Sequence, residues 1–164
     1  MIKAIRLHYW IGLVGVIALL GVAFFLQFYK GMNPCPLCIL QRCAMGVLAV
    51  VFFLGLLLPG DKRLHGCLTG LGMLAACGGL CFSGRQVWLQ FFPSAGPGDC
   101  GANLSMLIQL LPLDEVLKEV WQGGAECSAV SWTWMHMSLA AWSACVFVLL
   151  LFLIGMQMRR VAAL

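Results

Sequence analysis

The chain of 164 residues is too apolar for a soluble protein, since 62% of its residues are hydrophobic and only 10% are charged, against roughly 45–50% and 25% in soluble domains. This composition predicts an integral membrane protein with one domain, residues 1–164. The formal net charge of +4 then reports on membrane topology, and no nucleic-acid partner is expected.

Four windows are long and apolar enough to cross a bilayer, which takes about 20 residues of helix. They lie at about residues 10–29, 43–59, 64–84 and 137–156. The expected fold class is therefore all-α, a four-helix bundle embedded in the lipid bilayer. The first window is longer than the apolar core of a secretory signal and no small-residue cleavage site follows it, so we expect it to remain as a helix.

Basic residues orient the expected bundle. They precede the first span, separate the second from the third, and follow the fourth: Lys3, Arg6, Lys62, Arg63, Arg159 and Arg160. By the positive-inside rule these segments and both termini are cytoplasmic. The loops at about residues 30–42 and 85–136 then face outward, and the longer loop carries every acidic residue except Asp61.

Four of the nine cysteines fall in the two outward loops, namely Cys35, Cys38, Cys100 and Cys127. Thiols outside the cytoplasm tend to be oxidised, so this even number predicts two disulfides. The other five fall in the spans, where a small polarisable side chain packs well: Cys43, Cys67, Cys77, Cys81 and Cys145.

The segment Cys35-Pro36-Leu37-Cys38 stands at the start of the second helix. Cys38 is expected near the helix N-terminus, where unpaired amides and the helix dipole favour an anion. Arg42, one turn further on the same face, adds a positive charge. Both features favour the thiolate, which is the form that exchanges disulfides.

Arg42 itself has two interpretations. Its side chain could extend from the helix end to the membrane surface, as arginines at the mouths of membrane helices do. Alternatively, it could hydrogen-bond a polar group of an apolar ligand dissolved in the membrane, beside the thiolate of Cys38. The carbonyl oxygens of a quinone are such polar groups.

The second pair of loop cysteines lies on flexible sequence. Cys100 stands among turn-forming residues in the segment PGDCGAN, where a macromolecular partner could reach it. Cys127 follows Gly123 and Gly124. A disulfide between the two cysteines would close a loop without making it rigid, and a plain structural role for such a bond also remains open.

Between these two cysteines, residues 112–122 are expected to form a short helix, with Pro112 at its first position and acidic residues in its first turn. Its apolar stripe is expected to lie in the outer interface of the membrane: Leu113, Val116, Leu117, Val120 and Trp121. Such an anchor would hold the loop of the second cysteine pair near the membrane surface and near Cys35.

Two other uses of the cysteines are disfavoured. Haem attachment requires a histidine directly after the second cysteine of the pair, and Ile39 stands there. A zinc site of four thiolates is poorly matched, because Cys100 and Cys127 are not a closely spaced pair. No metal is therefore expected.

The order of these features resembles the DsbB family of bacterial inner-membrane disulfide-forming proteins. The likeness covers nearly the whole chain: a span, Cys-Pro-Leu-Cys followed by Arg42, two spans, a loop with two spaced cysteines, and a last span. Residues 86–93 also resemble the start of the second loop in that family. Gln41 and Gln86 depart from it, since some members carry an acid and a histidine at these positions.

The resemblance implies a protein dithiol:quinone oxidoreductase of the bacterial inner membrane, with catalytic loops in the periplasm. Its partner would be DsbA, a thioredoxin-like dithiol oxidase, and its cofactor a quinone, either ubiquinone or menaquinone. The implied catalytic groups are the disulfides Cys35–Cys38 and Cys100–Cys127. Reduced DsbA would attack Cys100, Cys127 would engage Cys35, and Cys38 would face the quinone beside Arg42.

Three other functions stay open at this point. A paralogue could serve a dedicated partner other than DsbA. An enzyme of the vitamin K epoxide reductase type would place its Cys-x-x-Cys pair late in the chain and its loop pair early, which is the reverse of the order here. A non-catalytic membrane scaffold would keep all four loop cysteines in stable disulfides.

Overall fold

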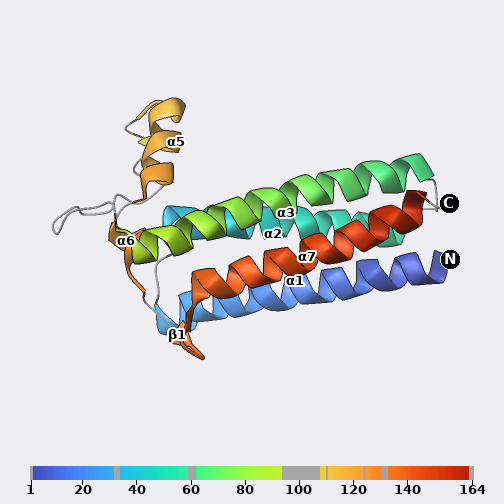
Figure 1. Ribbon diagram of the computed structural model, residues 1–164, viewed down its shortest axis with the longest axis horizontal. Coiled ribbons are helices and arrows are strands. Elements are labelled where there is room, and N and C mark those ends of the chain that lie inside the picture. The colour runs from blue at the N-terminus through green and yellow to red at the C-terminus, as the bar shows by residue number, and fades with distance from the viewer. Residues whose placement is uncertain are drawn as a thin grey trace.

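The computed structural model describes residues 2–31, 34–58, 62–93, 108–109, 111–123, 125–130 and 133–162. Four long helices lie side by side along the molecule (Figure 1): α1 (Ile2–Lys30), α2 (Pro36–Leu57), α3 (Lys62–Phe91) and α7 (Leu139–Ala162). Each is long and apolar enough to cross a membrane. The predicted all-α membrane bundle is thereby confirmed.

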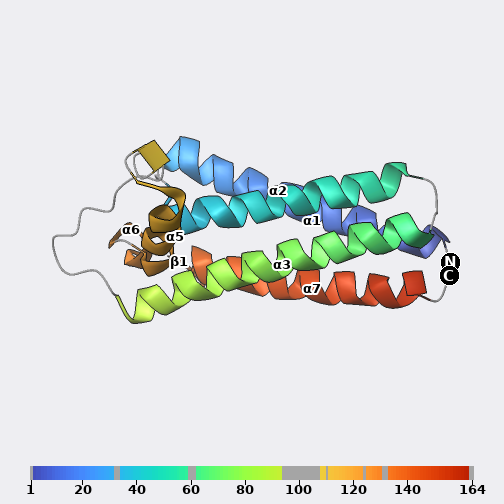
Figure 2. The ribbon, with the colours of Figure 1, turned by 90° about the horizontal axis from the view of Figure 1, so that it is seen from above.

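The shorter elements gather at one end of this bundle. They are α5 (Leu113–Gln122), α6 (Ala125–Ser128) and the two-stranded hairpin of β1 (Thr133–Trp134) and β2 (Met137–Ser138). Figures 1 and 2 show them at the end where α2 begins, whereas the start of α1 and the end of α7 lie together at the opposite end. We call these two ends the thiol end and the terminal end.

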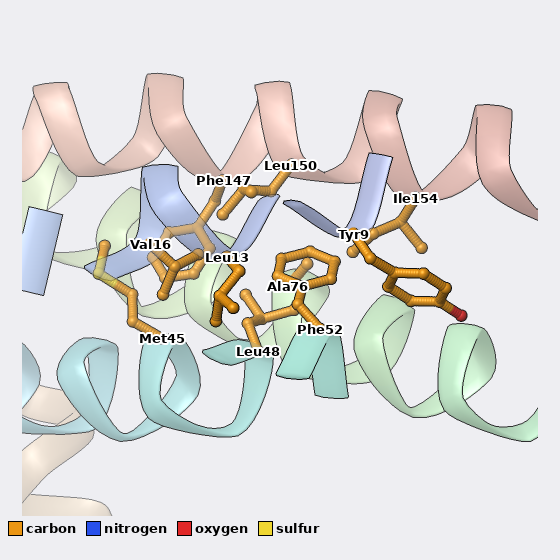
Figure 3. Packing of buried hydrophobic residues seen from close by; sticks show 10 residues of the cluster. All are labelled: Tyr9, Leu13, Val16, Met45, Leu48, Phe52, Ala76, Phe147, Leu150 and Ile154. Carbon is orange, nitrogen blue, oxygen red and sulfur yellow. The ribbon is translucent and has the colours of Figure 1, made fainter. Parts of the chain in front are cut away.

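The core of the bundle is built by all four long helices. Ten buried side chains converge between them (Figure 3): Tyr9, Leu13, Val16, Met45, Leu48, Phe52, Ala76, Phe147, Leu150 and Ile154. Close approach depends on small residues, as is usual between membrane helices. A Cβ on Gly79 of α3 would lie 2.2 Å from the ring of Phe147 in α7, so these two helices pack with almost no space between them.

At the thiol end, α2 begins earlier than the span predicted from hydropathy. It starts at Pro36 rather than near residue 43, and the Ile39 amide donates to the Cys35 carbonyl at 3.1 Å. Proline suits the first turn because no N–H is needed there. Residues 36–42 are therefore helical instead of loop, and Cys38 lies within the first turn of α2, near the helix N-terminus as expected.

The third helix also extends further, since α3 continues to Phe91. Residues 85–91 are therefore helical instead of loop. The hydropathy window ends at Arg85 because a charge lowers the average, but arginine and glutamine are good helix formers. The predicted span at 137–156 begins two residues too early, because Met137 and Ser138 form β2. The helix α7 starts directly after them, and the Ser138 hydroxyl accepts a hydrogen bond from the Ala141 amide in its first turn at 3.3 Å.

The predicted short helix exists as α5, with Pro112 just before its first residue. Figure 1 shows α5 at the thiol end, steeply inclined to the long helices and projecting to one side of the bundle. The side chains of its apolar stripe do not all have the same environment. Val116 and Val120 are buried against the bundle, whereas the remaining three side chains are exposed: Leu113, Leu117 and Trp121.

The expectation that the whole stripe faces lipid is therefore wrong for Val116 and Val120. These two valines pack against Leu37 and Leu89 of the bundle. Burial of branched side chains in an apolar cluster removes them from water as well as a lipid contact would. The helix is consequently attached to the bundle by part of its own apolar face.

Candidate redox-active site

Three of the predicted catalytic cysteines meet at the thiol end. Cys35 precedes α2, Cys38 lies in the first turn of α2, and Cys127 belongs to α6. The Cys35 and Cys38 sulfurs are 3.1 Å apart as two thiols, and the Cys127 thiol is hydrogen-bonded to Cys35. Cys35 therefore touches one thiol from each predicted pair. Cys100 lies outside the described residues, so its pairing with Cys127 and the Cys35–Cys38 disulfide remain predictions.

The surroundings of Cys35 keep its sulfur protonated. Its side chain is 4% exposed and belongs to an apolar cluster with Leu37, Leu89 and Cys127. The pKa of the Cys35 thiol is raised, first by its hydrogen bond to Cys127, then by its hydrogen bond to Cys38 and by burial. Negative charge within this pair is better placed on Cys38, which lies at the positive end of the α2 dipole.

The position of Cys127 depends on how α5 is attached to α3. Gly123 ends α5 with a φ of 74°, and a Cβ there would lie 2.3 Å from Leu89 Cδ1. The end of α5 therefore rests directly on α3. A side chain larger than hydrogen fits neither this backbone conformation nor this contact.

Arg85 of α3 makes a second attachment. Its Nε donates to the Trp121 carbonyl at 2.9 Å and its Nη2 to the Gln122 carbonyl at 3.4 Å. These are carbonyls at the C-terminus of α5, where a cation is favoured. The guanidinium carbon also lies 5.7 Å from the centre of the Trp121 ring. Together with Gly123, this contact holds the chain leading to Cys127 against α3.

Arg42 is held inside the protein by α1. Its Nη1 donates to Gln27 Oε1 and its Nη2 donates to the Ala23 carbonyl at 3.1 Å. The guanidinium carbon lies 5.3 Å from the centre of the Phe24 ring. These contacts fix the guanidinium against α1 instead of leaving it extended toward the membrane surface, and Arg42 also lines the cavity described below.

Gln86 of α3 is the contact that sequence reasoning missed. Its Nε2 lies 3.2 Å from the Cys38 sulfur and 3.4 Å from the Cys35 sulfur. The available signal was the absence of glycine and proline between Gly84 and Pro93, which allows the third helix to continue. On a continuing helix, Gln86 faces the bundle, and in the structure it is buried beside the thiols.

A cavity of about 270 Å³ opens beside the thiols. Its walls are mainly apolar and come from α1, α2, α7 and the hairpin, with Leu26, Met45 and Trp134 among them. Both Cys35 and Cys38 line it. So do six polar side chains: Gln27, Gln41, Arg42, Gln86, Gln90 and Ser143. An apolar pocket with a few convergent polar groups is the usual form of a site for a small organic ligand.

The described part of the chain contains no group of three or more histidine, cysteine, aspartate or glutamate side chains arranged to hold a metal ion. The three thiols instead form a row in space, from Cys127 in α6 through Cys35 to Cys38 in the wall of the cavity. A chain of neighbouring sulfurs can exchange disulfide bonds, because each thiolate can attack the next sulfur.

Comparisons with known proteins agree with this chemistry. A family model described as "Disulfide bond formation protein DsbB" matches residues 5–157. Proteins named "Disulfide bond formation protein B" from Acinetobacter baumannii and Acinetobacter baylyi are each 39% identical over 155 residues, covering 91% of this chain and 89% of theirs. The protein of that name from Chromohalobacter salexigens is 39% identical over 148 residues, covering 89% of this chain and 86% of its own.

No solved structure gives a significant match. The family model nevertheless covers all four long helices and both cysteine-bearing segments, and the similar proteins align over almost their full length. The chain therefore belongs to the DsbB family of disulfide bond formation proteins.

Proposed function

We propose that this protein is a thiol:quinone oxidoreductase, which reoxidises a DsbA-type periplasmic dithiol oxidase and passes the electrons to a membrane quinone. The observation that carries the proposal is the row of three neighbouring thiols, Cys127, Cys35 and Cys38, that ends at an apolar cavity. Electrons entering at Cys127 would reach the cavity by disulfide exchange alone.

Reduction potentials explain why a strong acceptor is needed. DsbA has a potential near about −120 mV, whereas structural disulfides lie below about −300 mV. Reoxidising DsbA with a disulfide of the latter kind would be uphill by roughly 8 kcal/mol, since about 30 mV corresponds to about 1.4 kcal/mol. The electrons must therefore be drawn onward, and quinones are the oxidants dissolved in a bacterial inner membrane.

Exchange along the row would proceed in two steps. A thiolate of reduced DsbA attacks Cys100, forming an intermolecular disulfide and releasing Cys127 as a thiolate. Cys127 then attacks Cys35, forming the Cys127–Cys35 bond and releasing Cys38 as a thiolate at the cavity. The contact between Cys127 and Cys35 supports the second step, because attack needs the two sulfurs to touch.

The cavity fits the head of a quinone. Its volume is close to the lower limit of about 300 Å³ for ligand pockets, which suits a single substituted ring. The quinone ring, when bound, would be the two-electron acceptor. The chain would contribute the Cys38 sulfur beside it, the guanidinium of Arg42 toward a carbonyl oxygen, and apolar walls such as Leu26 and Met45 that exclude water.

The proposed orientation places the thiol end in the periplasm and both termini in the cytoplasm. Five basic residues lie near the starts of α1 and α3 and the end of α7, which meet at the terminal end: Arg6, Lys62, Arg63, Arg159 and Arg160. Positive charge is retained on the cytoplasmic side of the inner membrane. The periplasm is also where DsbA and oxidised thiols are found.

The proposal is tested with purified protein, reduced DsbA and a soluble quinone, by measuring quinol formed and DsbA oxidised. One quinol is expected for each dithiol oxidised. A non-catalytic scaffold predicts instead that alkylation counts no new thiols when reduced DsbA is added without quinone. A dedicated partner would be revealed by trapping the protein attached to Cys100 in a Cys127→Ala variant.

Arg42→Met is expected to raise the apparent KM for quinone about tenfold or more, because a hydrogen bond from a charged group is lost in an apolar cavity. The rate of thiol exchange with DsbA should change little, since DsbA is proposed to attack Cys100, whereas Arg42 lies beside Cys38. Steady-state kinetics at varied quinone and at varied DsbA separate the two effects. Arg159→Met is the control, because Arg159 is an exposed arginine at the terminal end. An unchanged KM for quinone in Arg42→Met would contradict the ligand-binding role and favour the membrane-surface interpretation of Arg42.

A further inference from the structure

We infer that Gln86 is a catalytic residue of this site, whose side-chain amide donates a hydrogen bond to the Cys38 thiolate, and that Gln41 is the residue that positions the amide for this task. The inference rests on the proposed function only in taking Cys38 as the reactive thiolate. It adds a neutral, non-titrating donor to the site.

The geometry brings one amide to both sulfurs of the pair. Gln86 Nε2 lies 3.2 Å from Cys38 Sγ and 3.4 Å from Cys35 Sγ. The side chain is 5% exposed, so water does not compete for these contacts. A buried hydrogen bond to a charged group is stronger than one in water, because the surrounding dielectric constant is low.

Gln41 determines which end of the Gln86 amide faces the sulfurs. Gln41 Nε2 donates to Gln86 Oε1 at 2.7 Å. Turning the Gln86 amide over would place two NH₂ groups against each other, so its own NH₂ group must point to the sulfurs. Gln41 is buried as well, at 5% exposed, and comes from α2, whereas Gln86 comes from α3.

A third helix supports the orientation of Gln41. The hydroxyl of Ser143 in α7 lies 2.8 Å from Gln41 Oε1 and 2.9 Å from the Ala140 carbonyl. When the Ser143 hydroxyl donates to Gln41, the amide atom that it contacts must be the Gln41 oxygen, so the NH₂ group of Gln41 points toward Gln86. The hydrogen bonds therefore run from α7 through α2 to α3 and end on the Cys38 sulfur.

The same amide accommodates Cys38 in either protonation state. As a thiol, Cys38 can donate to Gln86 Oε1 at 3.5 Å; as a thiolate, it accepts from Gln86 Nε2 at the shorter distance. An amide gains and loses no proton between pH 5 and 8, unlike a histidine. Support for the thiolate should consequently not vary with pH in this range.

The test measures the Cys38 thiolate in the reduced full-length protein, without DsbA or quinone. Thiolate ultraviolet absorbance is recorded against pH, and the contribution of Cys38 is the difference from the same protein carrying Cys38→Ser. Gln86→Leu is expected to lower the ratio of thiolate to thiol at Cys38 roughly tenfold or more at a given pH, because a hydrogen bond to the charged form is lost. Gln86→His should restore thiolate, with a new dependence on pH near its own titration at about 6.5.

Gln41→Glu tests the positioning of the amide at constant size. A carboxylate has no hydrogen to donate, so the Gln86 amide would turn its NH₂ group toward Glu and its oxygen toward the sulfurs. The thiolate ratio should fall as it does in Gln86→Leu, although no atom in contact with sulfur has been removed. Because the added carboxylate charge would itself disfavour the Cys38 thiolate, Gln41→Met is measured beside it, since this variant removes the donor to Gln86 without adding charge. A purely structural role for Gln41 predicts that Gln41→Met leaves the thiolate ratio unchanged.

Gln157→Leu is the matched control, because it removes a buried glutamine amide from α7 at the other end of the bundle. If Gln86→Leu and Gln41→Glu both leave the Cys38 thiolate ratio at the value of wild type and of this control, the inference is overturned. Since neither partner is present in the measurement, a failure of quinone reduction would contradict the proposed function and leave this result intact.

Discussion

Cys38→Ser is expected to stop quinone reduction while the loop thiols still exchange. Its sulfur lines the cavity together with that of Cys35, and a serine oxygen can neither form the disulfide with Cys35 nor leave from it as a thiolate beside the cavity. Turnover with reduced DsbA and quinone should fall by at least about 10³-fold, as when a catalytic nucleophile is removed. The measurement is the rate of quinol formation.

In the same variant Cys35 has no disulfide partner, so as a thiolate it should attack Cys127 of the proposed Cys100–Cys127 disulfide, to which it lies close. A Cys35–Cys127 disulfide then forms and Cys100 leaves as a thiolate. Mass spectrometry of unreduced peptides would detect it. Cys43→Ser is the control, since Cys43 is an exposed thiol further along α2 and should leave turnover unchanged. Normal turnover in Cys38→Ser would contradict the proposed route of electrons.

Gly123→Ala is expected to separate Cys127 from Cys35. The added Cβ would lie 2.3 Å from Leu89 Cδ1, and the φ of 74° is one that alanine rarely adopts. The end of α5 would have to move away from α3 and carry the following residues with it. A displacement of about 1 Å can cost about 10²-fold in rate, and a loss of that order is expected in thiol exchange between the two pairs.

The rate is measured by mixing the oxidised protein with reduced DsbA in the absence of quinone, then quenching with acid and counting alkylated thiols at Cys35 and Cys38. Gly84→Ala is a suitable control, because a Cβ there meets no atom within 4 Å. Arg85→Ala should slow exchange less than Gly123→Ala, since it removes hydrogen bonds without creating a clash. Exchange at the wild-type rate in Gly123→Ala would show that the contact between α5 and α3 does not control this step.

Most of the fold could be predicted because crossing a membrane imposes a requirement on each helix separately. A span needs about 20 apolar residues whatever its neighbours are, so the four windows were found one by one. Their ends were less predictable. Hydropathy falls at the first charge, but α3 continues past Arg85 to Phe91, since arginine and glutamine are good helix formers. The carbonyls of Trp121 and Gln122, which accept hydrogen bonds from Arg85, lie far along the chain.

The residues of the candidate site were also predictable only in part. Cys35, Cys38 and Arg42 could be chosen from spacing, since a helix places residues four apart on one face. The absence of glycine and proline between Gly84 and Pro93 indicated that the third helix could include Gln86, but not that its side chain would reach the sulfurs, because that contact joins α3 to α2. Nor did the apolar stripe of α5 reveal that Val116 and Val120 would turn toward protein instead of lipid, since both environments suit a valine equally well.

The sequence by itself therefore determined the membrane class, the number of spans, and a Cys-x-x-Cys pair at a helix N-terminus with an arginine one turn away, because hydropathy and helix period act over neighbouring residues. The approach of Cys127 to Cys35 was expected from the resemblance and is present in the structure. The tertiary structure alone decided that α1 holds Arg42 and that Gln41 orients Gln86 toward the thiols. These contacts join segments distant in the chain, and they depend on packing between helices that no local pattern encodes.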